Sequence, residues 1–177
     1  MIINLVEKMI FYPEKHFIIE PEYFNLTYQD IYLTTADDVT IHGWFFPGRS
    51  AETLLFFHGN AGNIADRLDN IYRLWKHNLS ILIVDYRGYG KSEGSPSEKG
   101  SYLDAEAAWQ WLQLNPDLNP DKIVIFGRSL GGAIALYLAA RYKPYRLILE
   151  STFTSVKELG HQLLPLIPKS LIPNIYP

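Results

Sequence analysis

One serine lies in a sequence setting that could make its hydroxyl a nucleophile. It is Ser129, at the centre of the G-x-S-x-G pattern GRSLG at positions 127–131. The apolar run at 123–126 before it is typical of a buried strand, and the apolar spacing over 130–142 after it predicts a helix. A sharp strand-to-helix turn holds the serine in a strained, exposed conformation, and a side chain at either glycine would clash with neighbouring backbone. The pattern therefore predicts covalent attack on a carbonyl group, in preference to a glycine-rich turn with a capping serine.

A second candidate element is the glycine-rich stretch HGNAGN at positions 58–63, which follows the apolar run at 53–57. Acyl transfer places negative charge on the carbonyl oxygen, and fixed backbone N–H groups can stabilise that charge. We expect the two donors to be the N–H of Leu130, which follows the nucleophile, and the N–H of Asn60. A phosphate-binding loop is disfavoured, because the stretch matches neither G-x-G-x-x-G nor G-x-x-x-x-G-K-[ST].

Other polar side chains near these two segments are assigned supporting roles. Asp85 ends an apolar run and is expected to accept backbone N–H bonds from the turn at 86–90, with Arg87 as its ion-pair partner. Arg128 is expected to orient the loop that carries the nucleophile or, alternatively, to contact an anionic group of the substrate. His58 is expected to support the shape of the glycine-rich loop, not to transfer protons.

The pattern of apolar residues predicts an α/β fold that positions these segments. Residues 26–35 alternate in polarity and predict a strand. A second strand is predicted at 39–46, and the turn at 36–38 joins the two into an expected hairpin. Strands buried on both faces are predicted from short apolar runs at 53–57, 79–84 and 123–126, and a last strand is predicted at 146–149. Helical spacing is found at 64–77, at 97–115 with Ser97 as the N-cap, and at 130–142. This order predicts a mainly parallel sheet with an N-terminal antiparallel hairpin and helices on both faces.

Composition sets limits on the class of protein. The chain has 177 residues with a net charge of −3, which suits a single domain over 1–177 and gives no sign of nucleic-acid binding. It contains no cysteine, which excludes disulfides, thiolate catalysis and cysteine-ligated metals. Polar residues interrupt the apolar patch at 2–11, so neither a transmembrane helix nor a signal peptide is predicted there. We expect a cytoplasmic protein without membrane association.

Four motifs in order are similar to those of a known superfamily. They are HGNAGN at 58–63, DYRGYGKS at 85–92, GRSLGG at 127–132 and LESTFTS at 149–155. Together they resemble the α/β-hydrolase superfamily, in its branch of small serine hydrolases that are serine aminopeptidase-like or lysophospholipase-like. The resemblance covers about residues 10–160. It implies the α/β-hydrolase fold, acyl transfer on an ester, thioester or amide bond of a small-molecule substrate, and no metal or organic cofactor.

The resemblance also implies a catalytic triad whose acid and base follow the nucleophile in the order Asp, then His. No Asp follows Ser129, and the single later histidine is His161. The sequence is therefore predicted to be truncated at its C-terminal side and to lack the last strand–helix units. Its proline-rich segment 159–177 is the expected start of a cap or connecting segment.

Three hypotheses follow from the missing acid and base. Glu150 and His161 could act as a substitute acid and base for Ser129. Alternatively, the chain is a catalytically incompetent fragment or pseudoenzyme that retains a binding pocket. In either case the strand at 146–149 would leave one sheet edge unpaired, which predicts self-association.

Overall fold

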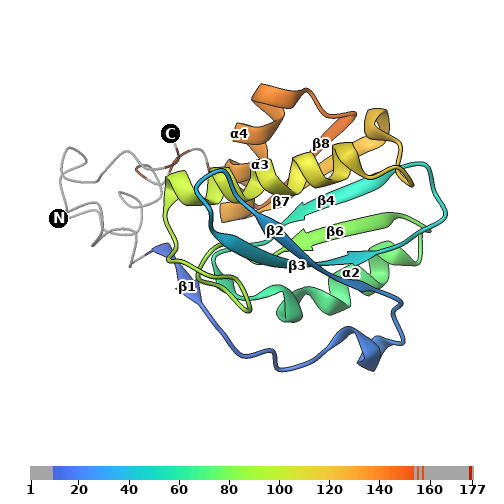
Figure 1. Cartoon of the computed structure of the whole chain (residues 1–177), viewed down its shortest axis with the longest axis horizontal. Coiled ribbons are helices and arrows are strands. Elements are labelled where there is room, and N and C mark those ends of the chain that lie inside the picture. The colour runs from blue at the N-terminus through green and yellow to red at the C-terminus, as the bar shows by residue number, and fades with distance from the viewer. Residues whose placement is uncertain (1–9, 154, 156, 158–175, 177) are drawn as a thin grey trace.

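The computed structural model describes residues 10–153, 155, 157 and 176 (Figure 1). In this part of the chain the main sheet has six strands in the order β2-β3-β6-β4-β7-β8. These strands are β2 (Gln29–Thr34), β3 (Thr40–Phe46), β4 (Thr53–Phe57), β6 (Ser80–Val84), β7 (Ile123–Arg128) and β8 (Arg146–Glu150). A separate parallel pair joins β1 (Tyr12–Pro13) to β5 (Ala61–Gly62). The longer helices are α2 (Leu68–Trp75), α3 (Glu98–Leu114) and α4 (Leu130–Tyr142), and the short 3₁₀ helices are η1 (Pro21–Phe24), η2 (Ile64–Arg67) and η3 (Pro120–Lys122).

The sheet confirms the predicted hairpin and the predicted parallel strands. β2 and β3 pair antiparallel, and β3 also pairs antiparallel with β6. The pairs β4–β6, β4–β7 and β7–β8 are parallel. The segment predicted as a helix at 64–77 begins as the 3₁₀ helix η2, continues as α2 and ends at Trp75, and the short helices η1 and η3 were not predicted. Asn63 and Asp66 form a capping box at its start.

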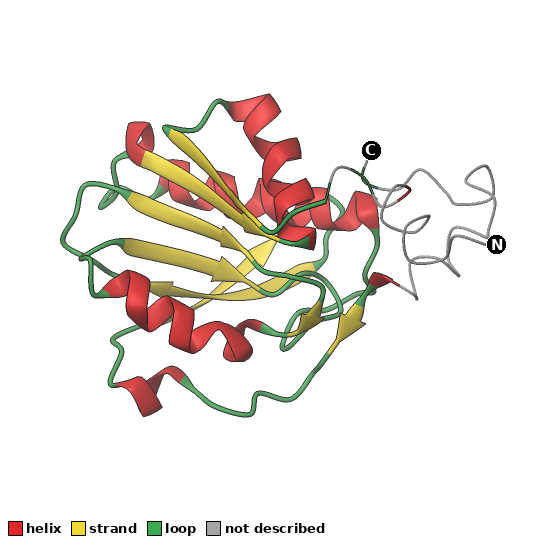
Figure 2. Cartoon of the chain, turned by 180° about the vertical axis from the view of Figure 1, so that it is seen from behind, coloured by secondary structure: helices red, strands yellow, loops and turns green. Residues whose placement is uncertain are grey.

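Helices cover both faces of the sheet, as predicted (Figure 2). Successive residues of a strand point to opposite faces, so one strand serves both cores. Leu55 and Ile125 pack in the core that contains α3 and α4, whereas Phe56 and Ile83 pack in the core that contains η2 and α2. The central strands are therefore buried on both sides, which explains their uninterrupted apolar sequences.

The parallel strands bring the candidate segments together at one edge of the sheet. β4, β6 and β7 run in the same direction, and their arrowheads point to the same side in Figure 2. The segments that follow them, 58–63, 85–92 and the turn at Ser129, therefore lie at the carboxyl edge. The short pair β1–β5 lies at the same edge. The proline-rich segment 159–177, apart from Tyr176, lies outside the described residues, and so does the apolar patch at 2–9.

Candidate active site

The backbone of Ser129 has the strained conformation that the sequence predicts. Its φ of 54° and ψ of −118° lie in a region that residues with a side chain rarely adopt. Three hydrogen bonds hold it there. The Ser129 N–H donates to the carbonyl of Glu150 at 2.9 Å, and the Ser129 carbonyl accepts from the N–H of Gly132 at 2.9 Å and from Oγ1 of Thr152 at 3.0 Å. These three hydrogen bonds therefore offset the conformational free energy that the strained backbone of Ser129 costs.

The two glycines of the motif allow the turn to pack tightly. A Cβ on Gly131 would lie well inside van der Waals distance of the backbone carbonyls of Phe57 and His58. A Cβ on Gly127 would overlap the carbonyl oxygen of Gly131. The predicted clash with backbone is confirmed at both positions, and α4 consequently starts directly against the end of β4.

The glycine-rich loop is fixed beside the serine by contacts far away in sequence. The Asn60 carbonyl accepts from the Tyr12 N–H at 3.1 Å and from the Tyr89 hydroxyl at 2.7 Å, while its side-chain Nδ2 donates to the carbonyl of Ile10 at 2.8 Å. None of these three bonds uses the Asn60 N–H. A Cβ built on Gly59 would lie 3.6 Å from Cβ of Ser129, so the loop passes close to the serine.

The second expected donor lies on the other side of the serine. Leu130 is the first residue of α4, and an N–H in the first turn of a helix has no partner within that helix. Since the Asn60 loop and the start of α4 both adjoin Ser129, an oxygen between them could receive two backbone N–H groups. That role for Asn60 and Leu130 stays a prediction.

The buried side chain of His58 holds the backbone of the 58–63 loop in place. Its ring is fully buried and stacks on Tyr86 with the ring centroids 4.4 Å apart. Nδ1 lies 2.7 Å from the carbonyl oxygen of Gly59, so this nitrogen carries the proton and donates. Burial lowers the pKa of His58 to about 3 and keeps the ring neutral. The neutral ring fixes the loop backbone, which agrees with the supporting role expected from the sequence.

The pKa of His58 makes stability depend on pH. Because the folded-state pKa lies below the unfolded value, the unfolded chain binds more protons below about pH 6.5. We expect wild type to lose about 2 kcal/mol more stability than His58→Gln between pH 7 and pH 5. Urea denaturation of both proteins at the two pH values measures this difference. Equal losses in the two proteins would contradict a neutral, buried His58.

Asp85 and Arg87 are both buried, but they do not pair with each other, so that part of the sequence interpretation is wrong. Asp85 Oδ1 accepts the N–H of Ile64 at 3.0 Å, and burial raises the pKa of its carboxyl group. The guanidinium of Arg87 instead contacts the carboxylates of Asp104 and Asp37. The carboxyl group of Asp85 therefore accepts the N–H of Ile64 instead of the expected N–H groups of the 86–90 turn. This hydrogen bond connects the end of β6 to the start of η2.

Glu150 and Arg128 lie next to the sharp strand-to-helix turn at Ser129, which is called the elbow below. The Arg128 Nε is 3.4 Å from Glu150 Oε2, and both side chains are partly exposed. The part of Glu150 that contacts the elbow is its backbone carbonyl, which receives the Ser129 N–H. His161 lies outside the described residues, so the substitute pair of Glu150 and His161 stays a prediction. Thr152, whose hydroxyl bonds to the Ser129 carbonyl, has a role that only the structure reveals.

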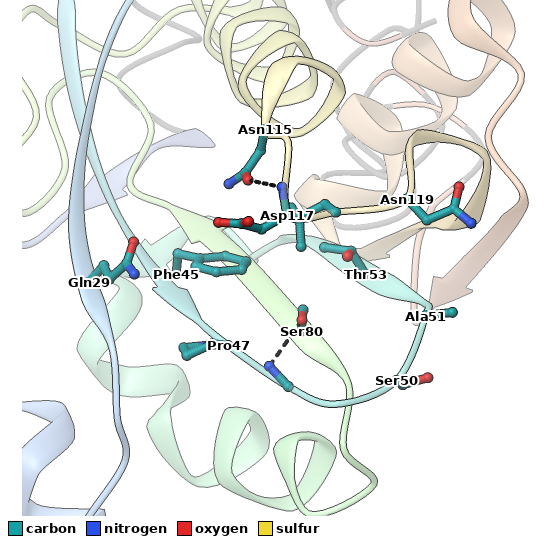
Figure 3. Close-up of a pocket in the computed structure, with 12 residues that line it drawn as sticks. Gln29, Phe45, Pro47, Ser50, Ala51, Thr53, Ser80, Asn115, Asp117 and Asn119 are labelled. Atoms are coloured by element: carbon teal, nitrogen blue, oxygen red, sulfur yellow. Dashed lines mark hydrogen bonds between the residues drawn. The ribbon is translucent and has the colours of Figure 1, made fainter.

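A cavity of about 310 Å³ lies at the other end of the sheet (Figure 3). It is lined by the first residues of β4 and β6, Thr53 and Ser80, and by Asn115, Asp117 and Asn119 beyond the end of α3. Ser129 follows the last residue of β7, so it lies at the opposite edge. The cavity is therefore separate from the candidate active site.

A strained serine between a strand and a helix, at the carboxyl edge of a mainly parallel sheet, defines the α/β-hydrolase architecture. The chain belongs to this family, because the family model described as alpha/beta hydrolase fold matches residues 52–169. It is 40% identical over 178 residues to the alpha/beta hydrolase domain-containing protein WAV2 of Arabidopsis thaliana, covering 94% of this chain and 58% of the relative. It is 42% identical over 153 residues to protein bem46 of Schizosaccharomyces pombe, covering 82% and 51%.

A solved structure shares the fold. The Pyrococcus furiosus esterase Pf2001 superposes with a TM-score of 0.74 at 22% identity, covering 94% of this chain and 71% of the esterase. The chain spans about half the length of the curated relatives described above. Within the part of the chain that the structure describes, no helix combines the length and apolar character needed to cross a membrane.

Proposed function

We propose that this protein is a serine hydrolase that acts by acyl transfer on an ester, thioester or amide bond of a small molecule. The observation that carries the proposal is the backbone of Ser129, held at φ 54° and ψ −118° beside the 58–63 loop. Strain of this kind is retained where it positions a reacting group.

The proposed reaction has two steps. The Ser129 oxygen attacks the carbonyl carbon, and the resulting oxyanion accepts hydrogen bonds from the N–H groups of Asn60 and Leu130. A base takes the serine proton and delivers it to the leaving group as the acyl-enzyme forms, and water then releases the acid. His161, oriented by Glu150, is the proposed base within this sequence.

Labelling with a fluorophosphonate probe tests the nucleophile. We expect mass spectrometry to find the phosphonyl group on the peptide that contains Ser129, because its oxygen is the one presented by the elbow. Ser129→Ala is expected to lose the label completely, whereas the nearby Ser151→Ala variant keeps it. A label on another residue, or an undiminished signal from Ser129→Ala, would contradict the proposal.

A second candidate function is a binding protein that keeps the site without turnover. It is favoured because both buried histidines among the described residues already bond to other groups: His42 Nε2 lies 2.6 Å from Asp30 Oδ1, and His58 Nδ1 lies 2.7 Å from the carbonyl oxygen of Gly59. Hydrolysis of p-nitrophenyl acetate by wild type, Ser129→Ala and His161→Ala decides between the two functions. Wild type far faster than both variants identifies His161 as the base. Equal rates in all three proteins support the binding protein.

A further inference from the structure

The buried side chain of Asp85 lies between the two ends of the 58–63 loop. Its carboxyl group follows strand β6 and is completely buried. Oδ1 accepts the N–H of Ile64, which follows the loop, at 3.0 Å, and lies 3.8 Å from Nε2 of His58, which begins the loop. Oδ2 lies 3.9 Å from Nδ1 of His42 on β3. One carboxyl group is therefore placed beside both ends of the loop and beside the neighbouring strand.

The carboxyl group of Asp85 has few hydrogen-bond donors for a buried acid. A carboxylate that stays ionised in a core needs several donors or a paired cation. The buried Asp104 has them, since it accepts the backbone N–H of Arg87 at 2.8 Å and Nε of the same residue at 3.0 Å. Within the described residues Asp85 receives one N–H, at Oδ1, and Oδ2 makes no hydrogen bond. A Cβ on Gly90 would overlap Oδ2, yet the N–H of Gly90 donates to the carbonyl of Glu14 at 2.9 Å. An ionised Asp85 would therefore be a buried charge with a single donor.

The tautomers of the two neighbouring histidines suit a protonated Asp85. Because Nδ1–H of His58 donates to the carbonyl of Gly59, Nε2 of this ring presents a lone pair toward Oδ1. A negative charge on Asp85 would repel that lone pair. His42 donates from Nε2 to the Asp30 carboxylate at 2.6 Å, so a neutral His42 ring presents the lone pair of Nδ1 toward Oδ2. A proton on Oδ2 is attracted to this lone pair, although 3.9 Å is longer than a hydrogen bond.

A neutral Asp85 also leaves the negative charge of this group of residues on Asp30, which is accessible to water. The side chain of Asp30 is 41% exposed, accepts Nε1–H of Trp44 at 3.1 Å and lies 3.8 Å from Nζ of Lys91. The alternative moves the proton to His42 and places two opposite charges in completely buried positions, 3.9 Å apart. The attraction of a buried ion pair offsets the loss of hydration only where hydrogen bonds complete the pair. The neutral form of Asp85 is therefore favoured.

We infer that Asp85 is a positioning residue for the 58–63 loop and acts as a neutral carboxylic acid. Its Oδ1 holds the N–H of Ile64, and its Oδ2 carries a proton directed at His42. This role deepens the proposed hydrolase function and rests on it, because the loop supplies the N–H of Asn60. Burial raises the pKa of the Asp85 carboxyl group, in agreement with the neutral form.

Two other titratable side chains lie near Asp85. The positive charge of Lys15 lowers the pKa of Asp85, which favours the ionised form, but its Nζ donates to the carbonyl of Ser92 at 2.7 Å. The hydroxyl of Tyr89 donates to the carbonyl of Asn60 at 2.7 Å. Both groups thus direct their hydrogen bonds to backbone carbonyls, and Asp85 keeps its proton.

Asp85→Asn tests the neutral acid, because an amide keeps an oxygen for Ile64 and an N–H group for the side that faces His42. Unfolded Asp85 is ionised above about pH 4, whereas the folded acid keeps its proton. The stability that depends on this proton is complete below about pH 4 and falls as pH rises, until the folded carboxyl group ionises. We therefore expect the unfolding constant of wild type, divided by that of Asp85→Asn, to rise about tenfold from pH 5 to pH 6.

Urea denaturation of the whole 177-residue chain and of its variant measures this ratio. His58 titrates in both proteins, so its contribution cancels. A carboxylate that is ionised in the folded protein predicts a constant ratio over this interval, and that result would overturn the inference.

The positioning role is tested through the rate at which the fluorophosphonate probe labels Ser129. We expect Asp85→Asn to match wild type. Asp85→Leu, which is similar in size but has no polar atom, should react about tenfold more slowly, because a displaced loop places the oxyanion donor wrongly. Asp85→Ala replaces this variant if Asp85→Leu does not fold. Asp69→Asn changes an exposed acid on α2 and is expected to leave the rate unchanged.

Equal labelling rates for wild type and the apolar variant would overturn the positioning role of Asp85. A wild-type chain whose Ser129 is not labelled at all would instead contradict the proposed hydrolase function, and the positioning role would fall with it. The ratio of unfolding constants still decides the protonation of Asp85 in that case, so the two failures are distinguishable.

Discussion

Replacing Arg87 with methionine is expected to lower the free energy of unfolding by about 3–5 kcal/mol, because the change leaves a buried carboxylate without its charged partner. Arg87 Nε donates to Asp104 Oδ1 at 3.0 Å, and Asp104 is completely buried. The same guanidinium donates two bonds to Asp37, at 2.8 and 2.9 Å. Arg87 thus connects the hairpin turn, the loop after β6 and helix α3, and urea denaturation at pH 8 measures its contribution.

Asp37→Asn is the matched control for this variant. The Asp37 side chain is 44% exposed, so water can solvate whatever the substitution leaves unpaired, and we expect a loss below about 1 kcal/mol. The deficit of Arg87→Met should also depend on pH. Burial raises the pKa of Asp104 to about 6 even with Arg87 present, so acid neutralises the stranded carboxylate in the folded variant. A deficit at pH 5 as large as that at pH 8 would argue against a charged Asp104 as the cause.

Gly131→Ala is expected to cost about 3 kcal/mol and to abolish labelling of Ser129, because the added Cβ overlaps the backbone carbonyl of Phe57. Relief of this overlap requires α4 to move away from β4, and that movement carries the serine with it. Thermal denaturation and fluorophosphonate labelling of the same preparation measure both effects.

Gly59→Ala is the matched control, because it adds the same methyl group to the 58–63 loop, on the other side of Ser129 from Gly131. Its Cβ would lie 3.6 Å from Cβ of Ser129 and 3.8 Å from the carbonyl oxygen of Arg128, which are ordinary contacts. We expect its stability to stay within about 0.5 kcal/mol of wild type. Equal losses for the two alanine variants would show that close packing at Gly131 does not determine the elbow.

Much of the fold could be predicted from local sequence patterns. The strand Thr53–Phe57 and the helix Leu130–Tyr142 have the bounds expected from apolar spacing, and Ser97 caps α3 as predicted by accepting the Gly100 N–H at 3.1 Å. The strain at Ser129 was also predictable, because a glycine on each side of a serine between a strand and a helix is a local signal. Each of these features depends on residues that are close together in the chain.

The sequence by itself thus determined the order of the elements, the faces they bury and the position of the strained serine, since hydrophobic periodicity and turn chemistry act over a few residues. Only the tertiary structure decided which distant groups meet. Arg87 does not pair with Asp85, its neighbour in the sequence. Its partners are Asp37 and Asp104, which are 50 and 17 residues away. The loop at Asn60 is likewise held by Tyr12. Such partners follow from the sheet register and helix packing, because a long side chain bonds to whichever group the fold brings to it, and no local pattern encodes that choice.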